Sequence, residues 1–237
     1  MELGEIAAWI LCGGRGERLD SRVGDRSKTV ALVGDTPFLE ILVRYVHGQG
    51  VCRFVLCAGF RAESVRSIVP DLDAYGELHI SVESRPLGTG GAVRHALDVV
   101  RSDPLLVLNG DSICPVDLSA MLAGHTERGA KLTLALSPVS AAADYGSVAL
   151  DSAGRVLSFS EKAPGAGLVN AGVYLIDRSL LSTRSNGEGF SLERDFFPTL
   201  VDRSLAYGYI HNGPFFDIGV PARYEKAEEV LSALGLL

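Results

Sequence analysis

A short segment near the start of the chain, ILCGGRGERLDSRVGDRSKT at residues 10–29, combines clustered glycines with a local excess of positive charge. Glycines let the backbone pass close to a polyphosphate and direct N–H groups at it, and arginine and lysine neutralise charge that amides cannot. The residues that we expect to act in this way are Gly13, Gly14, Gly16, Arg18 and Lys28. The segment therefore predicts a phosphate-binding loop, with a solvated surface loop as the alternative.

Two aspartates, each placed after an apolar run, could hold a metal ion next to that loop. Asp111 ends the segment PLLVLNGD, and Asp217 lies in PFFDIGVP. Ligands of open α/β sheets collect beyond the carboxyl ends of the strands, and Mg²⁺ prefers one or two carboxylates together with phosphate oxygens and water. Each aspartate alone would more simply be a turn or cap residue. Together with the loop, the two predict a phosphoryl-transfer site.

Other phosphate-binding and catalytic motifs do not match the chain. In a dinucleotide-binding fingerprint the third glycine would fall on Leu19, and the second expected strand ends at Gly59 without an acid for the ribose. In a Walker A loop, Arg22 stands where the first glycine should be. The histidines form no H-x-x-x-H pair and no triad with a serine. Zinc-enzyme and serine-hydrolase functions therefore have no support.

The composition is that of an ordinary globular protein: 237 residues, 47% hydrophobic and 22% charged, with a formal net charge of -7. The acidic balance argues against nucleic acid as the main partner, because phosphate-backbone binders carry a broad basic surface. No apolar run approaches the roughly 20 residues that cross a bilayer. Acidic residues also stand where a signal peptide is basic, so we expect a cytoplasmic protein with no membrane partner. The four cysteines lack CxxC spacing, and we expect them to be reduced.

Strand-like apolar runs alternate with amphipathic helical runs over the first 130 residues, as in a mostly parallel sheet with helices on both faces. The expected strands are 6–11, 53–59, 78–83 and 104–111, and the expected helices are 36–50, 62–69 and 90–102. Thr36 is the predicted N-cap of the first helix and Pro37 its first residue. From about residue 131 strands crowd together, with a hairpin turn at 151–154, before helices return at 192–201 and 221–234. We expect one Rossmann-like α/β domain over 1–237, with a nucleotide-type first half and a mixed second half.

Six segments resemble, in the same order, the motifs of the sugar-1-phosphate nucleotidyltransferases: the loop at 10–28, PLGTGGAV, VLNGDS, YGSVALDSAGRVLSFSEK, NAGVYLID and FFDIGVPARYEKA. The resemblance implies a GT-A-like fold without a C-terminal β-helix extension. It also implies that a sugar 1-phosphate attacks the α-phosphorus of a nucleoside triphosphate, with Mg²⁺ as cofactor and pyrophosphate leaving. Within the family the segments are most similar to the D-glycero-α-D-manno-heptose 1-phosphate guanylyltransferases, which implies GTP and that heptose 1-phosphate as substrates and GDP-heptose as product.

The resemblance also implies a role for each matching residue. Arg18 and Lys28 would stabilise the charge of the reacting triphosphate, and Asp111 and Asp217 would hold Mg²⁺. The implied nucleotide-binding residues are Cys12, Gly13, Gly14, Gly16, Glu83, Gly88, Thr89, Gly91 and Asn109. The implied sugar-phosphate-binding residues are Tyr145, Gly146, Glu161, Lys162 and Asn170. The alternatives are helix-start chemistry for Gly88 and Gly91, a packed aromatic for Tyr145, a solvated pair for Glu161 and Lys162, and a turn cap for Asn170.

The loop departs from the family pattern at Glu17, which replaces a threonine, and at Ser27-Lys28-Thr29, where many relatives have Pro-Lys-Pro. Alternative functions within the family are mannose-1-phosphate guanylyltransferase and a uridylyl- or thymidylyltransferase. A GT-A-like glycosyltransferase is disfavoured because the chain has Asn-Gly-Asp at 109–111, where Asp-x-Asp is typical. A non-catalytic regulatory subunit would typically lack a catalytic cation or a metal-binding aspartate, and all of these are present. A homo-oligomer is left open.

Overall fold

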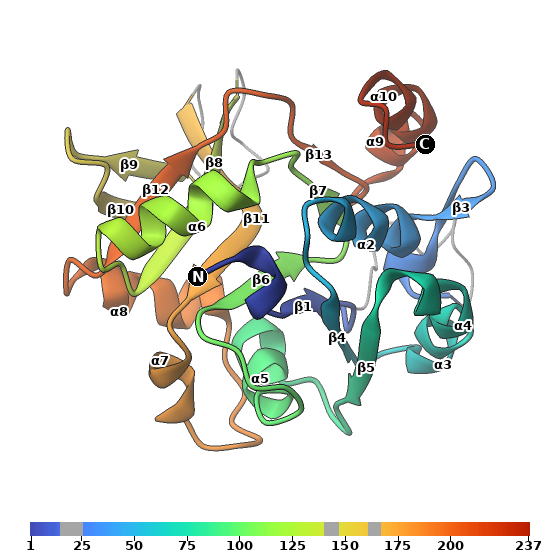
Figure 1. Ribbon diagram of the computed structural model, residues 1–237, viewed down its shortest axis with the longest axis horizontal. Coiled ribbons are helices and arrows are strands. Elements are labelled where there is room, and N and C mark those ends of the chain that lie inside the picture. The colour runs from blue at the N-terminus through green and yellow to red at the C-terminus, as the bar shows by residue number, and fades with distance from the viewer. Residues whose placement is uncertain (15–25, 140–146, 161–166) are drawn as a thin grey trace.

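The computed structural model describes residues 1–14, 26–139, 147–160 and 167–237. Over these residues a nine-stranded sheet forms the centre of the molecule, in the order β10-β9-β11-β6-β1-β4-β5, with β8 paired to β11 and β12 paired to β8 (Figure 1). The strands are β1 (Ala8–Leu11), β4 (Arg53–Ala58), β5 (Glu77–Val82), β6 (Leu105–Asn109), β8 (Leu132–Val139), β9 (Ser147–Leu150), β10 (Val156–Ser160), β11 (Gly167–Ile176) and β12 (Ala206–Ile210).

The directions of these strands create one edge where several chain segments emerge together. β1 is parallel to β4 and β6, and β4 is parallel to β5. β11 is antiparallel to β6, so its first residues lie where β6 ends. We call the side on which β1, β4, β5 and β6 end the carboxyl edge of the sheet.

Helices cover both faces of the sheet, and each face has its own apolar core. Ala8 and Ile10 belong to one core and Ala7 and Trp9 to the other, because successive side chains along a strand point to opposite faces. The first core is covered by α2 (Phe38–Gly48), α3 (Ala62–Arg66), α6 (Leu118–Glu127) and α10 (Ala227–Ala233). The second core is covered by α5 (Gly88–His95), α7 (Arg178–Ser182), the π-helical turn η4 (Leu192–Phe196) and α8 (Phe197–Val201).

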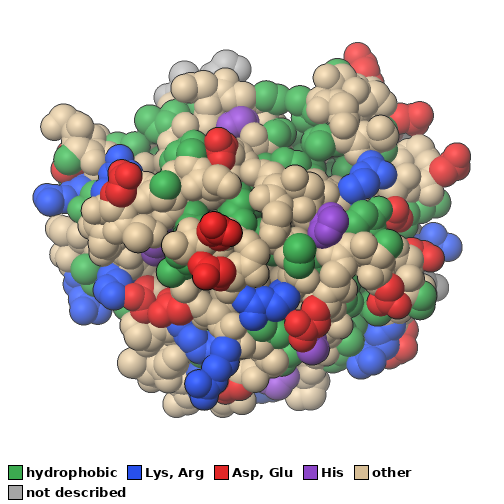
Figure 2. Space-filling model, in the orientation of Figure 1, with side chains coloured by type: hydrophobic (Ala, Val, Ile, Leu, Met, Phe, Trp, Pro, Cys, Tyr) green, Lys and Arg blue, Asp and Glu red, His purple; other side chains and the backbone are tan. Residues whose placement is uncertain are grey.

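Shorter elements complete the described structure. They are the 3₁₀ turns η1 (Leu3–Glu5), η2 (Lys28–Val30) and η3 (Asp73–Tyr75), the helices α4 (Val69–Leu72) and α9 (Pro221–Tyr224), and two small sheets, β2 (Leu32–Val33) with β3 (Thr36–Pro37) and β7 (Ser112–Ile113) with β13 (Phe216–Asp217). Among the residues described, no helix has the length and apolar character needed to cross a bilayer. Basic and acidic side chains are interspersed over the face in Figure 2.

The structure confirms the predicted fold class but corrects the start of the first long helix. That helix begins at Phe38, and Thr36 is not its N-cap. Thr36 and Pro37 instead form β3, which pairs with β2 around a turn in which Gly34 has a φ of +57°. Glycine adopts this left-handed conformation without the steric cost that a Cβ imposes, so a hairpin takes the place of the expected first turn.

Other boundaries shift for identifiable reasons. The helix expected over 62–69 is divided into α3 and α4, because Pro70 lies in the first turn of α4 and has no N–H with which to continue α3. α5 begins at Gly88 and ends at His95, not at 90 and 102, since the N–H of Leu97 already bonds three residues back in a tightened turn. The predicted hairpin at 151–154 is confirmed as the β9–β10 connection.

The helices expected near the end of the chain are each composed of two shorter elements. Residues 192–201 form η4 followed by α8, and residues 221–234 contain α9 and α10. Pro198 lies in the first turn of α8, where its missing N–H costs nothing because first-turn N–H groups have no helical partner.

Candidate active site

The predicted phosphate loop and Asp111 follow two neighbouring strands, β1 and β6, at the carboxyl edge. Leu11, at the end of β1, is the register partner of Asn109, at the end of β6. The N–H of Gly110 donates to the carbonyl of Leu11 at 3.1 Å. A Cβ at residue 110 would lie 2.5 Å from that carbonyl oxygen, so only glycine lets β6 turn this closely against β1. The turn places Asp111 beside the start of the loop.

Lys28 reaches the same place from η2. Its ammonium forms an ion pair with the carboxylate of Asp111, and the side chains are 14% and 29% exposed. Ser27 holds this turn, since its hydroxyl donates to the carbonyl of Cys12 at 3.2 Å and its N–H donates to Ser64 Oγ at 2.8 Å. A proline at residue 27 would lack both the hydroxyl and the N–H. The departure from the family pattern at Ser27 therefore has a structural role.

Asp217 lies next to Asp111 through the pairing of two very short strands. In the β13–β7 ladder Asp217 is the partner of Ser112, and the N–H of Ile218 donates to the carbonyl of Asp111 at 2.9 Å. Asp217 is 7% exposed. Its carboxylate accepts from the N–H of Gly219 at 2.8 Å and from Nε of Arg223, 3.1 Å from one oxygen and 3.0 Å from the other.

Sequence reasoning missed Arg223. The available signal was its position, six residues after Asp217 and in α9, the helix that follows β13. A half-buried arginine next to a buried carboxylate reduces the cost of burying that charge.

The two aspartates have the donor chemistry that Mg²⁺ requires. Carboxylate oxygens are its preferred protein ligands, and it commonly takes one or two of them. Among the described residues no group of three or more histidine, cysteine, aspartate or glutamate side chains could hold a metal. An ion held by Asp111 and Asp217 would therefore take its other ligands from substrate phosphates and water. Lys28 and Arg223, the cations on these carboxylates, would have to share them with the ion.

Glu83 closes the other side of the carboxyl edge, directly after β5. Its carboxylate accepts from the N–H of Leu87 at 3.2 Å. It also covers the loops that follow β4 and β1, because a Cβ at Gly59 or Gly13 would lie 2.5 Å or 3.4 Å from Glu83 Oε1. Partial burial raises the pKa of this carboxyl above its usual range, an effect that the Leu87 hydrogen bond opposes. Gly14, by contrast, is exposed and its Cβ position is open.

The start of α5 packs tightly against residues 188–191. A Cβ at Gly88 would lie 2.6 Å from the carbonyl oxygen of Phe190, and one at Gly91 would lie 2.6 Å from that of Glu188. Gly88 has a φ of +73°. The Phe190 carbonyl accepts the N–H groups of Gly90 and Gly91, at 3.0 and 3.2 Å. These contacts support the helix-start explanation of the glycines.

Asn109 and Asn170 lie near each other where β11 leaves the regular ladder. The β11–β8 register shifts between Asn170 and Tyr174, and within this bulge Gly172 has a φ of +74°. A Cβ at Gly172 would lie 2.7 Å from Asn109 Nδ2. Asn170 accepts from the N–H of Gly172 at 3.1 Å and donates to the hydroxyl of Tyr174 at 2.8 Å.

One predicted site residue belongs to the apolar core, and six lie outside the described part of the chain. Cys12 is fully buried, its thiol donates to the carbonyl of Ile10, and burial raises its pKa to about 12. It therefore belongs to the core, and only its backbone lies at the loop. The predicted residues outside the described part of the chain are Gly16, Arg18, Tyr145, Gly146, Glu161 and Lys162.

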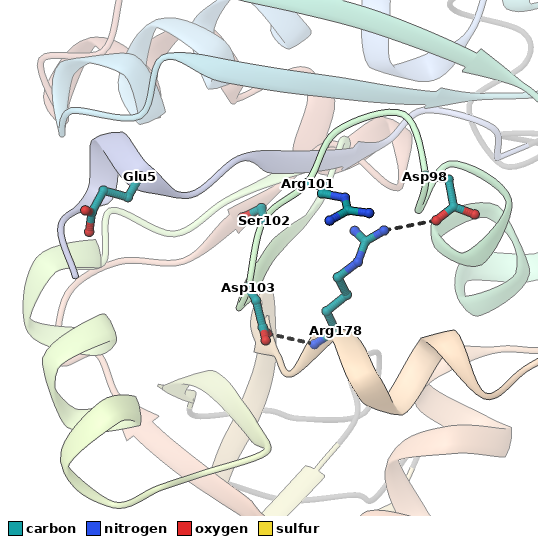
Figure 3. Close-up of a pocket in the computed structure, with 6 residues that line it drawn as sticks. All are labelled: Glu5, Asp98, Arg101, Ser102, Asp103 and Arg178. Carbon is teal, nitrogen blue, oxygen red and sulfur yellow. Dashed lines mark hydrogen bonds and ion pairs between the residues drawn. The ribbon is translucent and has the colours of Figure 1, made fainter.

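A separate cavity of about 560 Å³ lies at the opposite edge of the sheet and contains no predicted site residue (Figure 3). Its lining residues are Glu5, Asp98, Arg101, Ser102, Asp103 and Arg178. Arg178 crosses it, bonding Asp98 through its guanidinium at 3.0 Å and Asp103 through its backbone N–H at 2.9 Å. Among the described residues, Lys28, Asp111 and Asp217 lie together at the carboxyl edge, where ligands of an open α/β sheet are expected.

Comparison with known proteins identifies the family of the chain. Residues 7–233 match the nucleotidyl transferase family. The D-glycero-alpha-D-manno-heptose 1-phosphate guanylyltransferase of Aneurinibacillus thermoaerophilus is 35% identical over 227 residues, which cover 95% of this chain and 98% of that protein. The enzyme of the same name from Campylobacter jejuni is 35% identical over 220 residues, or 92% and 97% of the two chains.

A solved structure is similar over nearly the whole chain. The crystal structure of HddC from Yersinia pseudotuberculosis complexed with GMP-PN has a TM-score of 0.84 and 30% sequence identity, and the match covers 95% of this chain and 99% of that one. The resemblance inferred from the six sequence motifs is confirmed, and the chain belongs to the nucleotidyl transferase family.

Proposed function

We propose that the protein is a Mg²⁺-dependent guanylyltransferase that converts GTP and D-glycero-α-D-manno-heptose 1-phosphate into GDP-heptose and pyrophosphate. The observation that carries the proposal is the meeting of Lys28, Asp111 and Asp217 beside the glycine loop at the carboxyl edge. The two heptose 1-phosphate guanylyltransferases that are similar over nearly their full length support the choice of substrates. GTP is a cytoplasmic metabolite, so we propose that the reaction takes place there.

The mechanism needs no nucleophile from the protein. The phosphate of the sugar 1-phosphate is already ionised, so its oxygen can attack the α-phosphorus of GTP directly, forming the new P–O bond as the bond to pyrophosphate breaks. Catalysis then consists of positioning and charge stabilisation. The buried Cys12, whose pKa is about 12, is unsuited to covalent catalysis.

Each proposed residue contributes to one part of this reaction. The amides of Gly13 and Gly14 would approach the triphosphate, and Lys28 and Arg18 would balance the charge that grows on the leaving pyrophosphate. Asp111 and Asp217 would hold Mg²⁺, which when bound neutralises phosphate charge. On the sugar side we assign the phosphate to Lys162 and the hydroxyls to Glu161 and Asn170, as the family resemblance implies.

The substrate preference is the direct test of the proposal. Pyrophosphate release should be measured for GTP, UTP and dTTP, each with the heptose 1-phosphate, mannose 1-phosphate and glucose 1-phosphate. We expect the rate of pyrophosphate release with GTP to exceed that with UTP or dTTP. Each buried polar group that the wrong base leaves unpaired costs roughly 1–3 kcal/mol, which corresponds to about 10-fold or more in rate. The rate with the heptose 1-phosphate should exceed the rate with mannose 1-phosphate by no more than about 10- to 200-fold, because one added group on the sugar discriminates weakly. Faster turnover of UTP or dTTP with glucose 1-phosphate would place the chain in another branch of the family.

Glu83 is the side chain that we expect to contribute most to base selection. A carboxylate can accept from both N1–H and the exocyclic amino group of guanine, whereas thymine presents a single N3–H donor. Glu83→Gln removes one of the two acceptors, so the ratio of kcat/KM for GTP over dTTP should fall about tenfold. Glu77→Gln is a matched control, because Glu77 begins the same strand at the opposite edge. An unchanged ratio in Glu83→Gln would remove Glu83 from base recognition.

A further inference from the structure

Glu193 is absent from the predicted site, yet it bonds to side chains from both halves of it. We propose that Glu193 is a positioning residue that couples the nucleotide side of the active site, through Thr89, to the sugar side, through Tyr174 and Asn170. The proposal rests on the proposed function, because it uses the nucleotide-binding role that the family resemblance implies for Thr89 and the sugar-binding role proposed for Asn170.

The carboxylate of Glu193 lies half-buried in η4 and accepts hydrogen bonds from three hydroxyl groups. Thr89 Oγ1 donates to Oε2 at 2.7 Å, Ser191 Oγ donates to Oε2 at 2.8 Å, and the hydroxyl of Tyr174 donates to Oε1 at 3.3 Å. An ionised carboxylate only accepts hydrogen bonds, and bonds to a charged acceptor are stronger than neutral ones. The charge of Glu193 therefore orients all three hydroxyls.

On the nucleotide side, this bond fixes the beginning of α5. Thr89 Oγ1 donates to Glu193 and accepts from the N–H of Leu192 at 2.8 Å. The hydroxyl group is thus bonded on both sides to η4, and the backbone of residues 88–91 is held to the segment that precedes η4. The loop that begins at Glu83, the residue we assign to the nucleobase, ends at Gly88, where this attachment begins.

On the sugar side, the link passes through a fully buried phenol. The hydroxyl of Tyr174 accepts from Asn170 Nδ2 at 2.8 Å and donates onward to Glu193. Burial, followed by the charge of Glu193, raises the pKa of Tyr174 well above its usual range, so the phenol keeps the proton that it donates. Asn170 Oδ1 is engaged by the N–H of Gly172. The orientation of the Asn170 amide is therefore set from both of its ends.

The segments that meet at Glu193 are both irregular. η4 is a π-helical turn, and Asn170 to Tyr174 span the bulge in β11. Such irregularities are concentrated near functional sites, where they redirect side chains. Here the π turn directs Glu193 toward Thr89 and the bulge directs Asn170 toward Tyr174. One carboxylate joins the two, so a displacement on the nucleotide side is transmitted to the sugar side.

The test compares isosteric variants in which different parts of the link are removed. Glu193→Gln should raise KM for GTP and KM for the sugar 1-phosphate, each about tenfold, because an amide cannot accept all three hydroxyl bonds. Tyr174→Phe should raise only KM for the sugar 1-phosphate, since the bond from Thr89 to Glu193 remains. Ser191→Ala removes a hydroxyl that also donates to this carboxylate, but that hydroxyl connects Glu193 to no substrate-binding residue. The variant should leave both KM values within twofold of wild type. Thermal melting of all variants shows whether each one is folded.

The wild-type enzyme separates this proposal from the proposed function. If the wild type does not turn over GTP with either manno-configured sugar 1-phosphate, the proposed function is wrong, and the variants are then compared on the pair that the wild type uses. If the wild type is active and Glu193→Gln keeps both KM values within twofold, the coupling is absent. A Ser191→Ala variant with the same KM changes as Glu193→Gln would also overturn the proposal, because the effect would then follow local stability.

Discussion

Replacing Asp111 by asparagine is expected to lower kcat by a factor on the order of 10² to 10³, the scale of losing one strong transition-state stabiliser. The amide has no charge with which to hold Mg²⁺ or to pair with Lys28. The fold should survive, because the contact of Asp111 with Ile218 uses the backbone carbonyl, which the substitution keeps. Steady-state rates over a Mg²⁺ titration, together with thermal melting, check both statements.

The control for this change is Asp35→Asn, which removes an exposed carboxylate in the turn between β2 and β3. It should leave kcat within twofold of wild type. Binding of Mn²⁺ in the presence of GTP, followed by calorimetry, provides a readout that does not depend on turnover. Wild-type activity in Asp111→Asn, or full activity of the wild type in excess chelator, would exclude the metal site.

Lys28→Met is expected to have a similarly large effect, again a loss of about 10² to 10³ in kcat, with a smaller change in KM for GTP. An interaction that strengthens as charge develops on the leaving pyrophosphate stabilises the transition state more than the ground state, so its loss appears mainly in kcat. Lys28 is 14% exposed and begins the turn that Ser27 holds against Cys12. Its ammonium is therefore already positioned at the carboxyl edge before substrate binds.

The chain contains a matched control for this lysine. Lys131 forms a similar ion pair with Asp177 at the opposite edge of the sheet, where β8 begins and β11 ends. Lys131→Met removes the same charge from the same kind of pair and should leave kcat within twofold. If the two lysine variants lose equal activity, the loss reflects a general effect of breaking an ion pair, and Lys28 has no special role.

Lys28 and Asp111 are in contact, so their effects should not add. Residues that share one interaction show coupling energies of about 0.5–3 kcal/mol in double-mutant cycles. We expect the double variant Lys28→Met, Asp111→Asn to be little less active than either single variant. Strict additivity would mean that the two residues act on separate steps.

Much of this protein was predictable from local sequence patterns, because these patterns reflect interactions between near neighbours in the chain. Alternating apolar runs located β1, β4, β5 and β6 to within two residues of their ends. The rule that ligands gather beyond parallel strands then predicted where Asp111 and the glycine loop would lie. The motif order was enough to identify the family. The predicted start of the first long helix was wrong. Residues 32–37 form the β2–β3 hairpin, and this pairing prevails over the capping signal at Thr36.

Two of the site's connections could not be predicted in this way, because they join residues about a hundred positions apart. The sequence placed Asp111 and Asp217 in one predicted metal site, but the two-residue strands whose ladder joins them are too short to produce a recognisable alternation. Glu193 reaches Thr89 only because η4 and α5 pack on the same face of the sheet. In the sequence Glu193 is one acidic residue among many, and the hydroxyls of Thr89 and Tyr174 reach it only when the chain has folded. Hydrogen bonds depend on distances of about 3 Å and on direction, and residue spacing along a chain carries no information about either across such separations.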